Sequence, residues 1–203
     1  MPRSKPSTTV LNRARKIRVL LMDVDGVLTD GRIWLASWPD GTAHEIKGFS
    51  AYDGAGLKLA AAMGLRTGII TGRESAANAR RAQELGLEFV YQNRPEKMGA
   101  YEEILRKAGA SDAEVCYIGD DLPDLRVMKR VGLAVAVANA APEVRKVGHV
   151  VTKRSGGDGV VREVVEMILK AQGKWGEAIG KGGRKENSEL RNQNSEKRKK
   201  HKT

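Results

Sequence analysis

The middle of the chain alternates between short apolar runs and longer stretches with helical periodicity. The apolar runs, rich in Val, Ile and Leu, predict buried strands at 19–22, 67–70, 89–91, 115–118 and 133–137. The longer stretches predict helices at 56–63, 75–85, 96–107, 122–130, 142–147 and 159–171. Near-continuous apolar strands that alternate with helices are typical of a mainly parallel sheet covered on both faces. We therefore predict an α/β fold of the doubly wound, Rossmann type.

One segment, 31–49, interrupts this alternation. It contains Pro39-Asp40-Gly41, a turn sequence, between two short β-like arms. We predict a β-hairpin inserted after the first strand. The segment is too short to form a cap domain of its own.

The positive charge is confined to the two ends of the chain. The formal net charge is +11 over 203 residues, but 1–18 and 171–203 carry +6 each and the segment between them carries −1. Both ends are poor in large apolar side chains, so we expect them to bury little surface. We predict a basic N-terminal extension at 1–16, one domain at 17–175 and a disordered basic tail at 176–203.

Composition narrows the possible function classes. No apolar run reaches the roughly 18 residues that a membrane span needs, and no secretory signal precedes the first strand. The single cysteine, Cys116, excludes a disulfide framework and favours the cytoplasm. The basic ends leave open a non-enzymatic, nucleic-acid-associated protein, but no nucleic-acid-binding motif accompanies them and aromatic residues make up only 4%.

Polar side chains gather where the predicted strands end. In a doubly wound sheet the ligand site lies beyond the carboxyl ends of the strands, so residues that follow different strands are expected to meet there. They are Asp23 and Asp25 after the first strand, Thr71 and Arg73 after the second, Lys97 before the helix that follows the third, and Asp120, Asp121 and Asp124 after the fourth. Each has an alternative role as a helix cap or turn former. Together, the carboxylates would raise one another's pKa, and a hard cation such as Mg²⁺ would relieve the repulsion.

These motifs resemble a known set. Asp-x-Asp-Gly-Val-Leu-Thr, Ile-Ile-Thr-Gly-Arg, a lone Lys and Gly-Asp-Asp-x-x-Asp, in this order, are similar to the four motifs of the haloacid dehalogenase-like superfamily of phosphohydrolases. Within it, the chain resembles the 3-deoxy-D-manno-octulosonate 8-phosphate (KDO 8-phosphate) phosphatases, which also have a hairpin in place of a cap domain. The resemblance covers about 19–175 and implies a phosphatase of the lipopolysaccharide pathway.

The resemblance also implies a role for each acidic motif residue. Asp23 would attack phosphorus and form an aspartyl-phosphate. Asp25 would protonate the departing sugar oxygen and then accept a proton from water. Mg²⁺ would be bound by Asp23, the backbone carbonyl of Asp25 and Asp120, with Asp121 holding a metal-bound water.

The remaining motif residues would act on the phosphate. Thr71 would donate a hydrogen bond to a phosphate oxygen, and Lys97 would place a positive charge beside it. Asp124 would orient Lys97, or serve only as an acidic residue at a helix start. Gly26 would allow the backbone to approach the phosphate closely.

Substrate choice depends on a second group of residues. Arg73 is assigned to the sugar-acid carboxylate or the phosphate, against the alternative of a surface arginine at a helix start. Residues 51–56 resemble the family's Arg-Asp-Gly-x-Gly segment, which assigns Asp53 and Gly54 to substrate binding. Tyr52 stands where arginine is expected. The substrate is therefore KDO 8-phosphate or a related acidic sugar phosphate, such as a sialic acid or KDN 9-phosphate.

With no cap domain, the resemblance implies a homotetramer that closes the site around the hairpins. Trp34, Trp38 and Ile46 on the hairpin arms agree with a buried contact between subunits. The alternative is that they pack on their own sheet. Arg154 and Lys174 are further candidates for binding an acidic substrate, although exposed basic residues usually have no specific partner.

Overall fold

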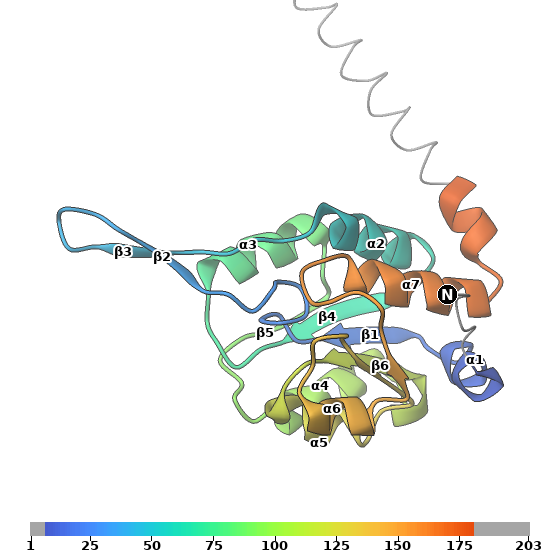
Figure 1. Cartoon of the computed structure of the whole chain (residues 1–203). Coiled ribbons are helices and arrows are strands. Elements are labelled where there is room, and N and C mark those ends of the chain that lie inside the picture. The colour runs from blue at the N-terminus through green and yellow to red at the C-terminus, as the bar shows by residue number, and fades with distance from the viewer. Residues whose placement is uncertain (1–6, 181–203) are drawn as a thin grey trace, which may run out of the picture.

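The core of the protein is a six-stranded parallel sheet (Figure 1). The computed structural model describes residues 7–180. In spatial order the strands are β5 (Phe89–Tyr91), β4 (Arg66–Ile70), β1 (Val19–Met22), β6 (Val115–Gly119), β7 (Leu133–Ala136) and β8 (Val150–Val151). Every neighbouring pair runs parallel, and β1 pairs on both sides, with β4 and β6. The predicted α/β sheet is confirmed. Only β8, two residues long, has no counterpart in the apolar pattern.

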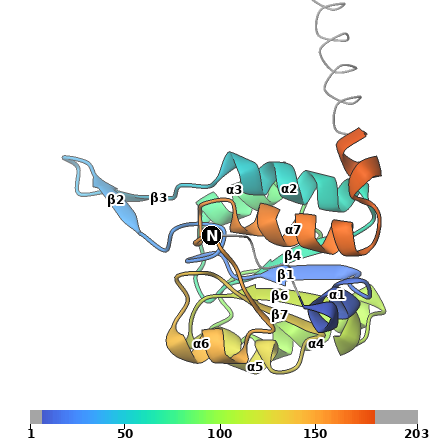
Figure 2. The same ribbon diagram turned by 45° about the vertical axis from the view of Figure 1, so that its right-hand side comes forward.

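Helices cover both faces of this sheet (Figures 1 and 2). One face carries α2 (Ala51–Ala62), α3 (Ala76–Leu85) and α7 (Val160–Ala171); the other carries α4 (Met98–Ala108), α5 (Leu125–Met128) and α6 (Pro142–Val147). Two 3₁₀ turns, η1 (Asp112–Glu114) and η2 (Leu122–Asp124), flank β6. None of the helices within residues 7–180 is long and apolar enough to cross a membrane. Strands with both faces covered explain why their sequences read as continuous apolar runs.

Helix α2 begins at Ala51, five residues before the predicted start. Its first turns are Ala-Tyr-Asp-Gly-Ala-Gly, which show no apolar periodicity. Small residues occur here because α2 packs closely on α7: a Cβ at Gly56 would lie 2.9 Å from the Cα of Arg162. Tertiary packing, not helix propensity, therefore fixes this end of α2.

The basic N-terminal segment is partly folded, which corrects the expectation that it buries little surface. Helix α1 (Thr8–Ala14) begins after Ser7, whose hydroxyl accepts a hydrogen bond from the Val10 amide at 3.3 Å. Val10 and Ala14 are buried. They occur at helical spacing in an otherwise polar sequence, so two apolar residues suffice to seat α1 on the fold.

The other end of the domain also extends past its predicted boundary at 175. Residues 175–180 are helical, and Ala178 is buried. The side chain of Gln172 donates a hydrogen bond to the Ile17 carbonyl at 2.7 Å, so this region lies beside the linker that follows α1. The rest of the predicted basic tail, from residue 181, lies outside the described residues.

The predicted hairpin is present as a separate two-stranded sheet. Strands β2 (Trp34–Ser37) and β3 (Ala43–Ile46) pair antiparallel, with Trp34 opposite Ile46. The hairpin projects from the body of the molecule in both views (Figures 1 and 2). Trp34, Trp38 and Ile46 are 60%, 51% and 53% exposed. Within one chain Trp38 contacts the His44 ring edge-on across the hairpin, with 4.9 Å between ring centroids, yet about half of each of these three side chains stays open to solvent.

Candidate active site

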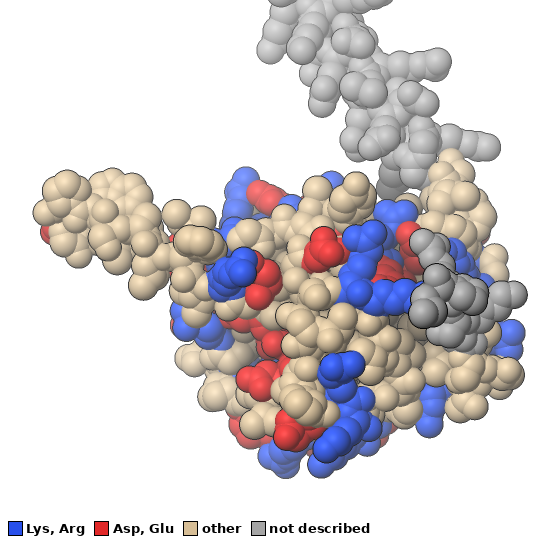
Figure 3. Space-filling view, viewed as in Figure 1, with Lys and Arg blue, Asp and Glu red and all other residues tan. Residues whose placement is uncertain are grey.

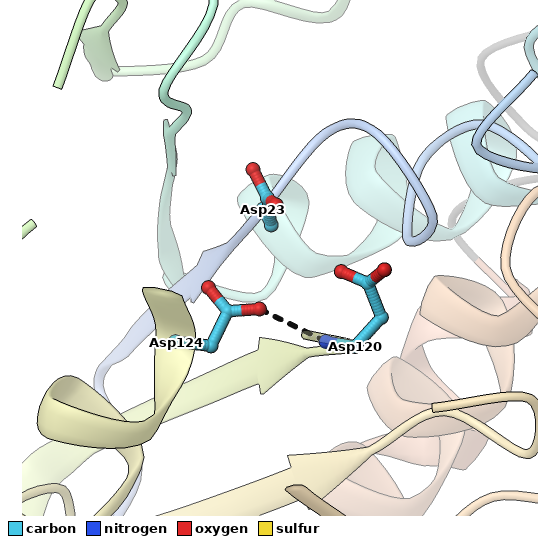
Figure 4. A group of neighbouring side chains, drawn as sticks. All are labelled: Asp23, Asp120 and Asp124. Carbon is cyan, nitrogen blue, oxygen red and sulfur yellow. Dashed lines mark hydrogen bonds between the residues drawn. The ribbon is translucent and has the colours of Figure 1, made fainter. Parts of the chain in front are cut away.

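Three carboxylates meet at the carboxyl ends of β1 and β6. Asp23 follows β1, Asp120 follows β6, and Asp124 lies one turn further on, in η2. Oxygen atoms of these side chains lie within 4.8 Å of one another, close enough to share one cation. Figure 4 shows the three side chains and the hydrogen bond that the Asp120 amide donates to Asp124 Oδ2 at 2.9 Å. Adjacent parallel strands thus bring together residues almost 100 positions apart.

Lys97 and Asp124 form a buried ion pair beside this group. Lys97 Nζ lies 2.6 Å from Asp124 Oδ1 and 3.1 Å from Asp23 Oδ2. Both residues of the pair are almost completely buried. The Tyr117 hydroxyl donates to Asp124 Oδ1 at 2.8 Å, a contact that sequence reasoning missed. Tyrosine within an otherwise apolar strand is a signal for such a partner, because a buried hydroxyl needs a hydrogen bond.

Burial and crowding perturb the ionisation of this group. Burial raises the pKa of Asp23 to about 6, with Lys97 opposing the rise and Asp124 adding to it. Burial, with the neighbouring carboxylates of Asp23 and Asp124, raises the pKa of Asp120 to about 8. Burial alone would lower the pKa of Lys97, but the two carboxylates beside it outweigh burial and raise it. The site therefore binds protons more tightly than its residues do in water, and a cation would replace them.

Gly26 is required by the geometry of this centre. Its φ of +93° is a conformation that L side chains rarely adopt. A Cβ at this position would overlap the carboxylate of Asp120. Any side chain at position 26 would therefore displace the Asp120 carboxylate; the approach of this backbone to phosphate stays a prediction.

The loops that follow β1 and β4 contribute three further predicted site residues, Asp25, Thr71 and Arg73. Asp25 Oδ1 accepts a hydrogen bond from Lys47 Nζ at 2.6 Å, a partner that sequence reasoning missed. Thr71 is buried, and its amide donates to the Tyr91 carbonyl at 2.9 Å. Arg73 is half exposed; its Nη2 donates to Glu45 Oε2 at 2.9 Å, and its Nε lies 3.8 Å from Asp25 Oδ2. The pattern of residue types holds no signal for Lys47, because it lies next to a hairpin that the sequence does not place relative to Asp25.

The structure does not bring Asp121, Asp53 and Gly54 into this group. Asp121 is exposed and caps η2, so its carboxylate is not among the three that cluster. Asp53 is 1% exposed, and its oxygens accept from the amides of Gly159 and Arg162 at 3.2 and 2.9 Å. It therefore caps the start of α7.

Gly54 is also buried within helix packing. A Cβ there would lie 2.5 Å from Arg81 Nη2. Lys174 donates to the Met63 carbonyl at 3.1 Å, at the end of α2. Arg154 donates to the Asp158 carbonyl at 2.8 Å and lies over the ring of Tyr52, 6.0 Å from its centroid. Within one chain, these contacts give Gly54, Lys174 and Arg154 structural roles.

Comparison with known proteins agrees with this geometry. Residues 74–164 match the haloacid dehalogenase-like hydrolase family. The chain is 41% identical over 174 residues to the 3-deoxy-D-manno-octulosonate 8-phosphate phosphatase of Salmonella typhi, covering 86% of this chain and 90% of the relative. It belongs to the KDO 8-phosphate phosphatase family of haloacid dehalogenase-like hydrolases. The resemblance stated from the motifs is confirmed, and the protein is a phosphatase.

Solved structures of this family superpose on the chain. The Yersinia pestis KDO 8-phosphate phosphatase is 42% identical with a TM-score of 0.78, covering 83% of this chain and 89% of that one. The Moraxella catarrhalis enzyme, in complex with magnesium, phosphate and KDO, is 40% identical with a TM-score of 0.79, covering 85% and 97%. The fold that carries the carboxylate group is therefore the fold of the family.

Proposed function

We propose that the chain hydrolyses KDO 8-phosphate to KDO and phosphate in a Mg²⁺-dependent reaction through an aspartyl-phosphate. The observation that supports this most is the meeting of Asp23 with Asp120 and the buried Lys97–Asp124 pair. A carboxylate beside a cation site and a fixed ammonium group is suited to attack on a phosphate, whose negative charge must be neutralised first. The similarity to an enzyme solved with magnesium, phosphate and KDO supports the choice of metal and sugar.

The residues present fit a magnesium ion. Asp120 Oδ1 is buried and has no hydrogen-bond partner among residues 7–180. Two carboxylates with raised pKa values need a positive charge to ionise together at neutral pH. Asp23, Asp120 and the backbone carbonyl of Asp25 would hold the ion, with Asp121 reaching it through water. Bound there, Mg²⁺ supplies neutralisation of charge on the transferring phosphoryl group.

Asp23 is the proposed nucleophile. Its Oδ1 accepts a hydrogen bond from the Val24 amide at 2.7 Å, and its Oδ2 faces Lys97. Oδ2 forms a bond to phosphorus as the bond from phosphorus to the sugar oxygen breaks. Lys97 and the Thr71 hydroxyl neutralise and hold the phosphate oxygens during this step. Asp124 keeps Lys97 in place throughout, because Asp124 lies within the buried core and cannot follow the substrate.

Asp25 handles the proton in both half-reactions. It donates a proton to the departing sugar oxygen, which leaves as an alcohol. It then accepts a proton from the water that attacks the aspartyl-phosphate, and phosphate is released while Asp23 is regenerated. The proton count balances over the cycle, so no other proton carrier is needed.

Arg73 is the proposed contact for the acid group of the sugar. Its guanidinium is half exposed beside Asp25 and can pair bidentately with a carboxylate. Tyr52, where the family resemblance leads one to expect arginine, is 69% exposed. Because position 52 lacks the arginine expected for KDO 8-phosphate, a related acidic sugar phosphate such as KDN 9-phosphate is the second candidate substrate.

We further propose that the chain acts as a homotetramer assembled through its hairpins. The hairpin's exposed apolar residues are Ile33, Trp34, Leu35, Trp38 and Ile46. On the face shown in Figure 3, this arm carries few charged side chains, unlike the body of the molecule. An apolar surface of this kind is typical of a contact between subunits.

The test is phosphate release from a panel of sugar phosphates, with Mg²⁺ and with a chelator. KDO 8-phosphate is expected to give a kcat/KM at least about tenfold above KDN 9-phosphate and simple hexose phosphates. Asp23→Asn is expected to lower kcat by at least about 10⁴-fold. Asp30→Asn, in the same loop but exposed, is the matched control and should retain full activity.

Three results would overturn the proposal. They are undiminished release by Asp23→Asn, full activity in chelator, or a preference for another sugar phosphate. The third would replace only the sugar and leave the phosphatase chemistry in place.

A further inference from the structure

Four charged side chains form a closed ring at the base of the hairpin. Lys47 Nζ lies 2.6 Å from Asp25 Oδ1 and 3.8 Å from Glu45 Oε1. Arg73 closes the ring, with Nη2 2.9 Å from Glu45 Oε2 and Nε 3.8 Å from Asp25 Oδ2. Positive and negative charges alternate around it. Two members follow strand ends of the core and two come from the end of β3 and the residues after it, so the ring joins the hairpin to the site.

Lys47 is the least accessible member of this ring. Its side chain is 0% exposed, compared with 18% for Asp25 and 50% for Arg73. An ammonium group removed from water is costly unless it is paired and hydrogen-bonded. Lys47 is therefore fixed by its contact with Asp25, and it in turn restricts the rotation of that carboxylate.

The two oxygens of Asp25 differ in their surroundings. Oδ1 accepts the hydrogen bond from Lys47. Oδ2 has no hydrogen-bond partner among the described residues, and Arg73 Nε lies 3.8 Å from it. An oxygen that exchanges a proton with substrate must be free of other hydrogen bonds and correctly aimed. Of the two oxygens, only Oδ2 is free of a hydrogen bond within the described residues.

We infer that Lys47 is a positioning residue, which holds Asp25 by Oδ1 so that Oδ2 faces the oxygen of the departing sugar. The inference rests on the proposed function. As the Asp23–phosphorus bond forms and the phosphorus–sugar oxygen bond breaks, the proton on Oδ2 passes to the sugar oxygen. In the second step the attacking water gives its proton to Oδ2. Glu45 secures Lys47 from the hairpin side and anchors it to the core through the Ser75 hydroxyl, which donates to Oε1 at 2.5 Å.

The alternative is that the ring only anchors the hairpin. The two roles differ in their dependence on the leaving group. A sugar alkoxide must be protonated as it leaves, whereas p-nitrophenolate leaves without a proton. A positioning role for Lys47 therefore affects aspartyl-phosphate formation from a sugar phosphate far more than from p-nitrophenyl phosphate. An anchoring role affects both alike.

The experiment compares Lys47→Met with wild type in the full chain. The sugar phosphate that wild type hydrolyses fastest is used for steady-state kinetics. Single-turnover release of p-nitrophenol, with enzyme in excess, reports formation of the aspartyl-phosphate alone. We expect kcat on the sugar phosphate to fall by about 10²–10³-fold with KM within about threefold, and p-nitrophenol release to stay within about threefold of wild type. Lys47→Arg, which keeps the charge, should recover at least about tenfold of the loss.

Controls separate this role from loss of fold. Lys58→Met removes an exposed lysine on α2 and should leave both rates unchanged. Circular dichroism and light scattering monitor folding and assembly of each variant. Should Lys47→Met fail to fold, Lys47→Gln is expected to lower kcat on the sugar phosphate, by less because it retains a hydrogen-bond donor, while p-nitrophenol release stays within about threefold of wild type.

Two outcomes overturn the inference: an equal loss on both substrates, or no loss on the sugar phosphate. Failure of the proposed function would be seen separately, in wild type, as no hydrolysis of any sugar phosphate.

Discussion

The hairpin follows Asp23 closely in sequence, yet the hairpin and the cluster of Asp23, Asp120 and Asp124 are built in opposite ways. Asp23 and Asp120 follow the two central strands, β1 and β6, whose residues are all buried. The hairpin projects into solvent and exposes Trp34 and Leu35 by 60% and 68%. The first region gains rigidity from the core of its own chain. The second has no such support, which indicates that its apolar surface serves contacts outside the chain.

This contrast predicts how substitutions divide between stability and assembly. Changes at the strand ends should alter the free energy of unfolding of the single chain. Changes at the hairpin tip should leave that quantity almost constant and alter association. The expected effect on the free energy of unfolding falls from the buried Lys97 to the exposed hairpin.

The largest effect is expected from Lys97→Met. It leaves the carboxylates of Asp23 and Asp124 without their cation in a buried site, which costs about 3–5 kcal/mol. Phosphate release should also fall by at least about 10²-fold, because the charge beside the phosphate is lost. Urea unfolding and phosphate release measure the two effects.

A second variant sharpens this result. In Lys97→Met combined with Asp124→Asn, stability should partly recover because one buried charge is removed, while activity should stay low. Lys129→Met, at an exposed lysine, serves as the control. A cost below about 1 kcal/mol for Lys97→Met would show that the buried pair is not a stabilising centre.

An intermediate effect is expected from pH and metal. Asp23 and Asp120 have pKa values raised to about 6 and about 8 by burial. Groups with raised folded pKa values bind protons more tightly in the folded chain, so metal-free protein should lose stability as pH rises from about 4 to 8. Mg²⁺ in 100-fold excess over its Kd adds about 2.7 kcal/mol, or roughly 5–10 °C in Tm.

The pH dependence provides the check on this prediction. The Tm increase with Mg²⁺ should be large at pH 8 and small at pH 5, where protons compete with the ion. Thermal unfolding with Mg²⁺ and with a chelator measures it. An equal increase at both pH values, or none, would argue against Asp23 and Asp120 as the ligands.

The smallest effect on stability is expected at the hairpin. Trp34→Ser with Leu35→Ser should change the free energy of unfolding of the chain by about 0.5 kcal/mol or less, because both side chains are exposed. Light scattering should show a smaller assembly than wild type. Val151→Ser, at a partly exposed apolar residue of β8, is the control. A wild-type chain that is monomeric at all concentrations would contradict the proposed assembly.

The same contrast explains what the sequence could and could not predict. Parallel strands that are buried on both faces appear in the sequence as continuous apolar runs. The runs at 19–22 and 115–118 therefore predicted β1 and β6 closely. Because strand ends define one edge of the sheet, the meeting of Asp23 and Asp120 followed from the fold class alone.

Contacts that depend on how separate elements pack together produce no such pattern in the sequence. Asp53 carries a motif resemblance but caps α7, over 100 residues away in the chain. The contact between Lys47 and Asp25 depends on the path that the chain takes from the hairpin back to the core, which the sequence pattern does not specify. Helix α1 was missed because a buried Val10 and Ala14 among basic residues carry little apolar signal.

The side-chain contact from Gln172 to the Ile17 carbonyl has a practical consequence. It places α1 and the segment after α7 together at the amino ends of the strands, while Asp23 and Asp120 lie at the carboxyl ends. A linker joined at Ser7, or at the helix that ends the described chain, would therefore lead away from the catalytic edge. Immobilisation of the enzyme on a support through that side would leave the reacting face turned toward the flowing substrate.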